Sequence, residues 1–143
     1  MTVDDTGTVD LDDARDFVRS HHRAVIATRT PHRVQQAPVL VGVDADGRLV
    51  VSSWETTYKV KHLRADPWVQ LCVIPDGFFG DWVYLEGDAE VVSLPEAMQP
   101  LVEYYRGISG EHDDWDEYRA AMESERRVMI RITPHRAGPD RRG

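Results

Sequence analysis

Residues 52–71 read SSWETTYKVKHLRADPWVQL, and the pattern of apolar residues changes twice along this stretch. It begins where a short β-branched run ends. From Tyr58 to Ala65 the apolar residues then follow helical spacing, and Pro67 predicts that this helix ends just before it. Apolar residues return with strand-like density over Trp68–Ile74. The stretch therefore predicts a strand, a short helix and a second strand, joined by tight turns.

The rest of the chain supplies further strands. A turn over residues 44–47 (DADG) is typical of a hairpin, because its glycine accepts a positive φ. Most connections are too short for the crossover that parallel neighbours need, so antiparallel pairing is expected. The sequence predicts a mainly β fold, a small six-stranded antiparallel barrel with flanking helices. The six predicted strands are Arg23–Arg29, Val34–Val43, Arg48–Ser53, Trp68–Ile74, Asp81–Ser93 and Val128–Ile132.

Three more helices are expected outside the barrel. Asp10 is a suitable N-cap for the first, Pro95 marks the start of the second, and Pro100 is expected to kink that helix. The third spans about Asp114–Ser124, with acidic residues at its positive end. We expect one folded domain over residues 11–134, with flexible tails at residues 1–10 and 135–143.

Composition excludes several classes of function. The chain has 143 residues, 25 acidic against 17 basic side chains and a net charge of −8, which disfavours binding to a nucleic acid backbone. It has one cysteine, too few for a disulfide framework. No apolar run reaches the length of a membrane span, and the acidic N-terminus is unlike a signal peptide. We expect a cytoplasmic protein without membrane or nucleic acid partners.

The segment that joins the strand to the short helix has the composition of an anion site. Hydroxyl groups, the free N–H groups of a helix start and lysine side chains together bind phosphate. An ordinary solvated helix face with capping hydroxyls would have the same local sequence, so both interpretations stay open. The candidate residues are Ser52, Ser53, Thr56, Thr57, Lys59 and Lys61.

Two further segments are candidates for contact with a planar ligand. In residues 34–39 (VQQAPV), two amides precede Pro38, which cannot donate to a strand ladder. Such a strand either lies at a sheet edge or uses its backbone and amides to border a flat heterocycle. The loop over residues 76–82 (DGFFGDW) sets aromatic rings on glycines, which favours a ligand-lining, interface-forming or barrel-covering role.

Other chemistry has little support. No histidine pair has the spacing of a helical zinc site, and the acidic run at residues 111–116 lacks the pattern of a calcium loop, so no metal site is predicted. No acid–base or nucleophilic set emerges, so we assign no catalytic residue. A bound cofactor would explain that pattern.

Four stretches carry a family resemblance that spans about residues 11–134. The chain resembles the pyridoxamine 5′-phosphate oxidase-like flavoproteins, which have the FMN-binding split-barrel fold. Within that group it is most similar to the deazaflavin-dependent oxidoreductases that use coenzyme F420. The stretches are residues 24–28 (AVIAT), 59–71 (KVKHLRADPWVQL), 86–91 (EGDAEV) and 110–128 (GEHDDWDEYRAAMESERRV).

The resemblance implies a six-stranded split β-barrel that works as a homodimer, with cofactor sites between the subunits. Lys59 matches the lysine that contacts the cofactor phosphate, and Trp82 matches a part contributed by the second subunit. The hydroxyl residues Ser52, Ser53, Thr56 and Thr57 match the turn around the phosphate. The ring is expected to lie beside Gln35, Gln36, Ala37, Pro38 and Val39.

One departure concerns Thr57, which stands where relatives often have arginine; Lys61 or Arg64 would replace that charge. The implied activity is F420-dependent transfer of a hydride to a small unsaturated or quinone-like acceptor. Two alternatives are an FMN-binding oxidase or flavin reductase of the same fold, and a non-catalytic F420-binding or carrier protein.

Overall fold

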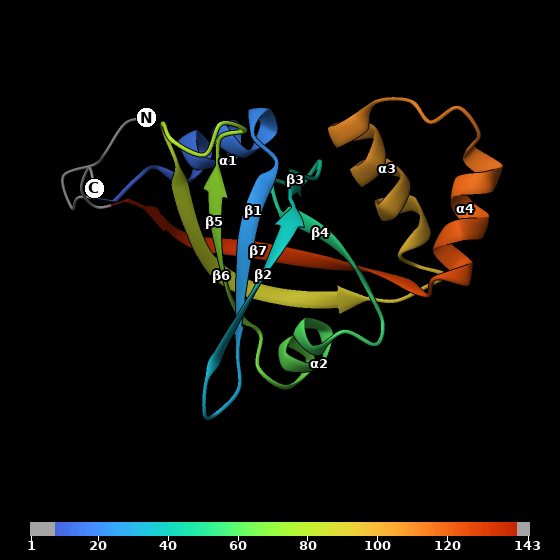
Figure 1. Cartoon of the computed structure of the whole chain (residues 1–143), viewed down its shortest axis with the longest axis horizontal. Helices are drawn as coiled ribbons and strands as arrows, with labels where there is room; N and C mark the ends of the chain where they lie inside the picture. The colour runs from blue at the N-terminus through green and yellow to red at the C-terminus, as the bar shows by residue number, and fades with distance from the viewer. Residues whose placement is uncertain (1–7, 140–143) are drawn as a thin grey trace.

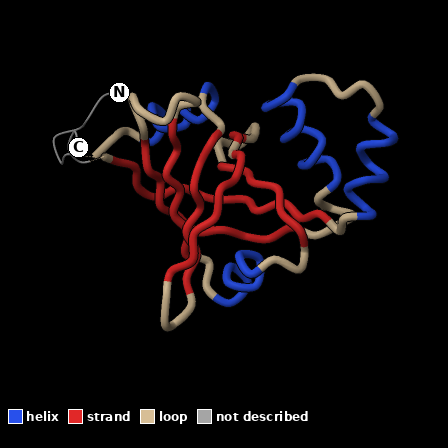
Figure 2. The backbone as a smooth tube through the Cα atoms, in the orientation of Figure 1, coloured by secondary structure: helices blue, strands red, loops and turns tan. Residues whose placement is uncertain are grey.

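A single curled sheet lies at the centre of the fold in the computed structural model, which describes residues 8–139 (Figures 1 and 2). Its seven strands follow the order β2-β1-β5-β6-β7-β4-β3, and all neighbours pair antiparallel. The predicted mainly β, antiparallel split-barrel fold with flanking helices is confirmed. The strands are β1 Arg23–Arg29, β2 Val34–Leu40, β3 Gly42–Val43, β4 Leu49–Trp54, β5 Trp68–Ile74, β6 Val83–Val92 and β7 Arg127–Gly138.

The count of seven strands, rather than the predicted six, comes from a break in the expected strand Val34–Val43. Val41 is fully buried and separates β2 from β3. The two parts pair with different partners, β2 with β1 and β3 with β4, and they form the two ends of the sheet. Burial alternates along β5, as expected when one face of a strand packs on a core. Inward-facing apolar side chains of β1, β4, β5, β6 and β7 fill that core.

The helices are α1 Leu11–Ser20, α2 Tyr58–Ala65, α3 Met98–Ser109 and α4 Trp115–Ser124. Asp10 caps α1, since its carboxylate accepts the backbone N–H groups of Asp12 and Asp13. The predicted bounds of α2 are confirmed. The predicted start of α3 at Pro95 is wrong, because the helix begins at Met98. The predicted kink at Pro100 is also wrong, because Pro100 lies in the first turn of the helix. An N–H group there has no acceptor within the helix, so proline does not interrupt it.

The α3–α4 pair is inserted between β6 and β7 and has a core of its own (Figure 1). Leu101 and Val102 of α3 and Tyr118 of α4 pack against Val50 and Met129, which lie on the outer face of β4 and β7. The sheet is therefore apolar on both faces at this point.

The structure extends the folded domain beyond its predicted ends. β7 continues to Gly138, so residues 135–138 belong to the sheet, and Val9 forms a β-bridge with Ala137. These segments correct the predicted tail boundaries at residues 10 and 135; the remainder of both predicted tails, residues 1–7 and 140–143, lies outside the described residues. Within residues 8–139, none of the helices is both long and apolar enough to cross a membrane.

Candidate functional site

The start of α2 is open toward the end of β4. Thr57 is the N-cap residue, but its side chain does not cap the helix. Instead its hydroxyl donates to the carbonyl of Trp54 at 3.1 Å and lies 3.0 Å from Oγ of the buried Ser53. The hydroxyl-capped helix considered above is therefore not what forms. Among residues 8–139, no side chain accepts from the first N–H groups of α2, which suits an external anion.

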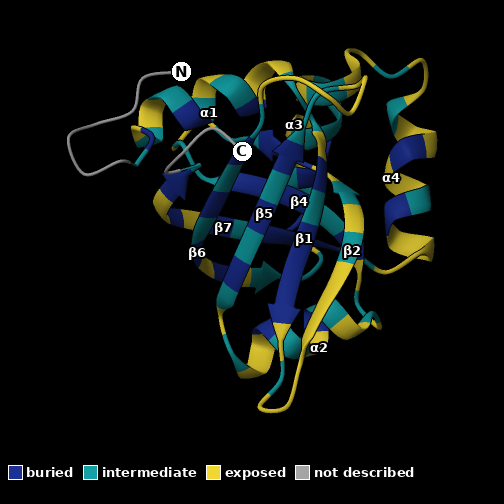
Figure 3. Cartoon of the chain, turned by 60° about the vertical axis from the view of Figure 1, so that its left-hand side comes forward, coloured by how far each residue is buried: buried dark blue, intermediate teal, exposed yellow. Residues whose placement is uncertain are grey.

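A cavity of about 250 Å³ brings this helix start together with the edge strand β2. It is called the α2 cavity below. Gln35, Gln36 and Ala37 contribute one wall, and Lys59 stands on the other. Figure 3 shows β2 as a largely exposed strand, which leaves its amides accessible beside α2. The cavity is lined by Ile26, Thr28, Gln35, Gln36, Ala37, Thr57, Tyr58 and Lys59.

Lys59 is a partly buried cation without a counter-ion. Among residues 8–139 it makes no hydrogen bond or ion pair. Burial lowers the pKa of its ammonium group below 10.5, and the positive charge of Arg127 lowers this pKa further. Because both effects disfavour the charged form, an anion bound here would stabilise it.

Arg127 is a second cation at this site, and sequence reasoning missed it. It opens β7 and pairs with Trp54 across the sheet. Its guanidinium carbon lies 3.9 Å from the centroid of the Trp54 ring, and Nη1 donates to Oγ of Ser52 at 3.4 Å. Nη2 donates to Glu125, while the buried Nε has no acceptor within residues 8–139. Pairing across β4 and β7, which no local pattern reveals, places this charge beside Ser52.

Arg64 does not replace the arginine that relatives often have at the position of Thr57. Its Nη2 donates to a carboxylate oxygen of Glu55 and to Oγ of Ser93 at 3.0 Å. Ser93 also donates to Glu55. Arg64 is therefore held in an ion-paired cluster, and Arg127 is the additional cation close to Lys59.

The remaining predicted residues are not all gathered at the α2 cavity. Thr56 and Lys61 are exposed, and the Lys61 ammonium lies 5.5 Å from the Tyr58 ring. Pro38 and Val39 line a different cavity, of about 510 Å³, on the β1–β2 face of the sheet.

Trp82 lies at the far end of the β5–β6 hairpin. Trp68 pairs with Asp88 near α2, whereas Val73 pairs with Val83 next to Trp82. A single chain therefore does not bring Trp82 to the α2 cavity. The loop before Trp82 exposes two large apolar side chains, Phe78 and Phe79.

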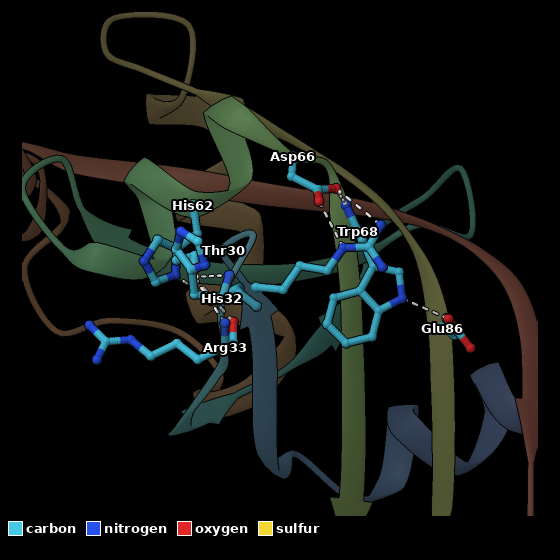
Figure 4. A network of polar contacts seen from close by, with 9 residues as sticks. Thr30, His32, Arg33, His62, Asp66, Trp68 and Glu86 are labelled. Atoms are coloured by element: carbon cyan, nitrogen blue, oxygen red, sulfur yellow. Dashed lines mark hydrogen bonds and ion pairs between the residues drawn. The ribbon is translucent and has the colours of Figure 1, made fainter.

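A polar network fastens the C-terminal end of α2 to the sheet (Figure 4). Arg29 of β1 donates to Asp66, the C-cap residue of α2, and the contact holds the pKa of that carboxyl below its usual range. Asp66 also accepts the backbone N–H of Trp68, whose indole N–H donates to Glu86 at 2.7 Å. Earlier in α2, Nδ1 of His62 lies 3.0 Å from Oγ1 of the buried Thr28. These contacts fix α2, and with it Lys59, against β1 and β5.

The side chains that line the α2 cavity can bind a ligand through hydrogen bonds and charge. Within the described part of the chain, no three His, Cys, Asp or Glu side chains gather where they would hold a metal ion. The cavity offers amides, hydroxyls, helix N–H groups and one lysine. Such a set suits a phosphorylated ligand with a flat polar ring.

The fold and this cavity define the chain as a split-barrel protein with a lysine-lined cavity beside its edge strand. It belongs to the pyridoxamine 5′-phosphate oxidase family, whose model matches residues 11–138. Among solved structures, it is similar to the conserved hypothetical protein Rv2991 from Mycobacterium tuberculosis, with 25% identity and a TM-score of 0.74 over 96% of this chain and 88% of that one.

Two more distant structures share the fold. An F420 reductase is 18% identical, with a TM-score of 0.66 over 87% of this chain and 94% of that chain. An FAD-binding protein from Mesorhizobium loti is 16% identical, with a TM-score of 0.61 over 91% of both chains. The family match thus indicates an oxidoreductase-type protein, and the F420 reductase and the FAD-binding protein share its fold.

Proposed function

We propose that this chain is an F420-dependent oxidoreductase that transfers a hydride to a small unsaturated or quinone-like acceptor. The observation that carries the proposal is the α2 cavity, where the β2 amides face an uncapped helix start and the unpaired cation Lys59. The resemblance of residues 59–71 to the deazaflavin branch supports it.

The charge of the site favours F420 over FMN. The phosphodiester of F420 carries a single negative charge, whereas the terminal monoester of FMN carries about two. Lys59 is the one cation among the residues that line the α2 cavity. Arg127 lies behind it, with its guanidinium directed to Trp54 and Ser52. A single lining cation suits the singly charged phosphodiester of F420 better than the monoester of FMN.

Lys59 and the helix N–H groups would hold the phosphate, while Gln35 and Gln36 would bind the edge of the ring. The cofactor itself supplies the hydride when it is reduced. The protein then has to orient the ring and exclude water from one face. The contacts of Asp66 and His62 prepare this geometry by holding α2 in place.

The functional unit of this proposal is a homodimer. Trp82 is too far along the β5–β6 hairpin to serve the α2 cavity of its own chain, so it would serve that of the partner. The exposed rings of Phe78 and Phe79 are consistent with a subunit contact at the same loop.

Parallel fluorescence titrations with F420 and FMN test the cofactor, and reduction of menadione by reduced F420 tests the activity. We expect micromolar or tighter binding of F420, weaker binding of FMN, and oxidation of reduced F420 faster than without protein. Preferential FMN binding would replace the proposal by the flavin alternative. Binding of F420 without turnover of menadione or an unsaturated ketone would favour a carrier.

A further inference from the structure

A second cavity, of about 550 Å³, lies between α3 and the β3–β4 hairpin. It is called the α3 cavity here, and it shares no lining residue with the α2 cavity. Figure 1 shows α3 standing beside β3 and β4. Val43, Val50 and Ile108 give the α3 cavity an apolar wall. Its volume falls in the range of small-molecule sites.

Two glycines keep the walls of the α3 cavity bare. Gly107 lies within α3, and a Cβ atom added there would meet no atom within 4 Å. A Cβ atom on Gly42 would meet Val50 and Ile108 at ordinary contact distances of 3.6 and 3.7 Å. Neither glycine has a positive φ. Since glycine in a helix costs about 0.5–1 kcal/mol relative to alanine, no local requirement explains Gly107. Its effect is to leave room in the cavity.

Arg131 of β7 provides an incompletely satisfied cation at this cavity. Its side chain is 20% exposed, and its one ion pair is with Glu90, at 3.3 Å. Glu90 is 59% exposed and also faces Arg48 at 3.6 Å, so two guanidinium groups share one solvated carboxylate. Among residues 8–139, the buried Nε atom of Arg131 has no hydrogen-bond acceptor. Exposed ion pairs of this kind contribute little stability, so they give way to a better-placed anion.

The carboxylates that line the cavity already have partners, and two of them pair with Arg48, whose Nη2 donates to Asp46 at 2.9 Å and whose Nε lies 3.4 Å from Asp44. Asp44 accepts the backbone N–H groups of Asp46 and Arg48, at 2.9 Å each. Glu103 accepts from Arg106 at 3.0 Å and from Gln99 at 2.8 Å. The lining contains four arginines and three carboxylates. Three of these arginines have close carboxylate partners: Arg19 pairs with Asp16, Arg48 with Asp46, and Arg106 with Glu103 and Glu111. Arg131, next to the apolar wall, is therefore the cation that remains for a ligand.

We propose that the α3 cavity is a second binding site, which takes an amphipathic organic monocarboxylate. The carboxylate of the ligand binds Arg131, and its apolar body lies on Val43, Val50 and Ile108. This site is independent of the cofactor proposed above.

Isothermal titration calorimetry on the full chain with trans-cinnamate tests the proposal, and cinnamamide serves as the uncharged isostere. We expect cinnamate to bind at least about tenfold more tightly than cinnamamide, because a charged hydrogen bond is lost with the amide. Arg131→Gln should weaken cinnamate binding by a similar factor. Gly107→Leu should also weaken it about tenfold by filling the cavity, while favouring the helix.

The matched control is Arg119→Gln, on the exposed side of α4, where Arg119 lies 4.0 Å from Asp116. It should change cinnamate affinity by less than about twofold, in keeping with an exposed charge. Lys59→Met should also leave cinnamate affinity unchanged, even where it abolishes F420 binding. Thermal melts establish that each variant is folded. The proposal is overturned if cinnamate does not bind, if cinnamamide binds as tightly, or if folded Arg131→Gln retains full affinity.

Discussion

Replacement of Lys59 by methionine removes the charge of the α2 cavity while keeping most of the aliphatic stem. Lys59 has no partner within residues 8–139, so the substitution breaks no ion pair there. Its charged form is disfavoured in the free protein, as its lowered pKa indicates. We therefore expect no loss of stability from the missing charge. The whole effect should fall on anion binding.

A charge-assisted hydrogen bond contributes about 1.5–3 kcal/mol, which corresponds to about a 10- to 150-fold change in Kd. Fluorescence titration with F420 should show a loss of this size for Lys59→Met at neutral pH. Lys61→Met is the matched control, because the exposed Lys61 ammonium lies over the Tyr58 ring and outside the cavity lining. It should cost less than about twofold. Equal losses in the two variants, or none in Lys59→Met, would refute the assignment.

The same site has a definite pH dependence. The pKa of Lys59 lies below the usual 10.5. As the pH rises, its ammonium group therefore loses its proton, and with it the attraction for an anion, earlier than an ordinary lysine does. F420 affinity should therefore stay constant near neutral pH and fall as the pH rises through the pKa of Lys59. In Lys59→Met this alkaline fall should be absent. An identical fall in both proteins would assign it to another group.

Three further perturbations test the fold. Burial raises the pKa of Tyr118 from 10.0 to about 12, so the phenol loses its proton at a lower pH in the unfolded chain than in the folded one. Above pH 10 the free energy of unfolding should therefore drop by up to about 1.4 kcal/mol per pH unit. Urea titrations of Tyr118→Phe should show a shallower drop. That variant should also lose about 1 kcal/mol at neutral pH, because the buried Tyr118 hydroxyl donates to the Leu101 carbonyl at 2.7 Å. Gly87→Ala should destabilise by about 3 kcal/mol in urea denaturation, since its Cβ would lie 2.1 Å from the Thr133 carbonyl oxygen; an unchanged midpoint would contradict that close approach. Asp10→Ala should cost about 1 kcal/mol and lower the Tm through loss of the α1 cap, and Asp10→Asn should recover most of it.

Local signals were sufficient for the elements nearest the site. The bounds of α2 followed from helical spacing that stops at Asp66 and Pro67, and the structure agrees. β1 and β5 were predicted with their observed bounds, because each is a short apolar run between polar residues. The cap at Asp10 also formed as expected, and acidic residues lie at the start of α4 as predicted. These features depend on neighbours within a few residues.

Features that depend on distant partners were not predictable. The end of β7 was missed because Pro134, His135 and Arg136 hide its alternation, and pairing with β6 sustains the strand instead. Arg127 reaches Ser52 only through the β4–β7 ladder, so no motif joins them. The α3 cavity likewise depends on how α3 packs against β3 and β4. Sequence spacing thus located the helix start at the α2 cavity, but it did not reveal Arg127 beside Ser52 or the α3 cavity.

The insertion of α3 and α4 makes the two cavities separable in evolution and in engineering. Val92, at the end of β6, pairs with Met129 near the start of β7, so the inserted segment leaves and re-enters the sheet at adjacent positions. A tight turn in its place would convert β6 and β7 into a simple hairpin. Every residue that lines the α2 cavity lies outside residues 93–126, whereas α3 forms a wall of the α3 cavity. Exchange of this segment between relatives would therefore alter the α3 cavity and keep every residue that lines the α2 cavity.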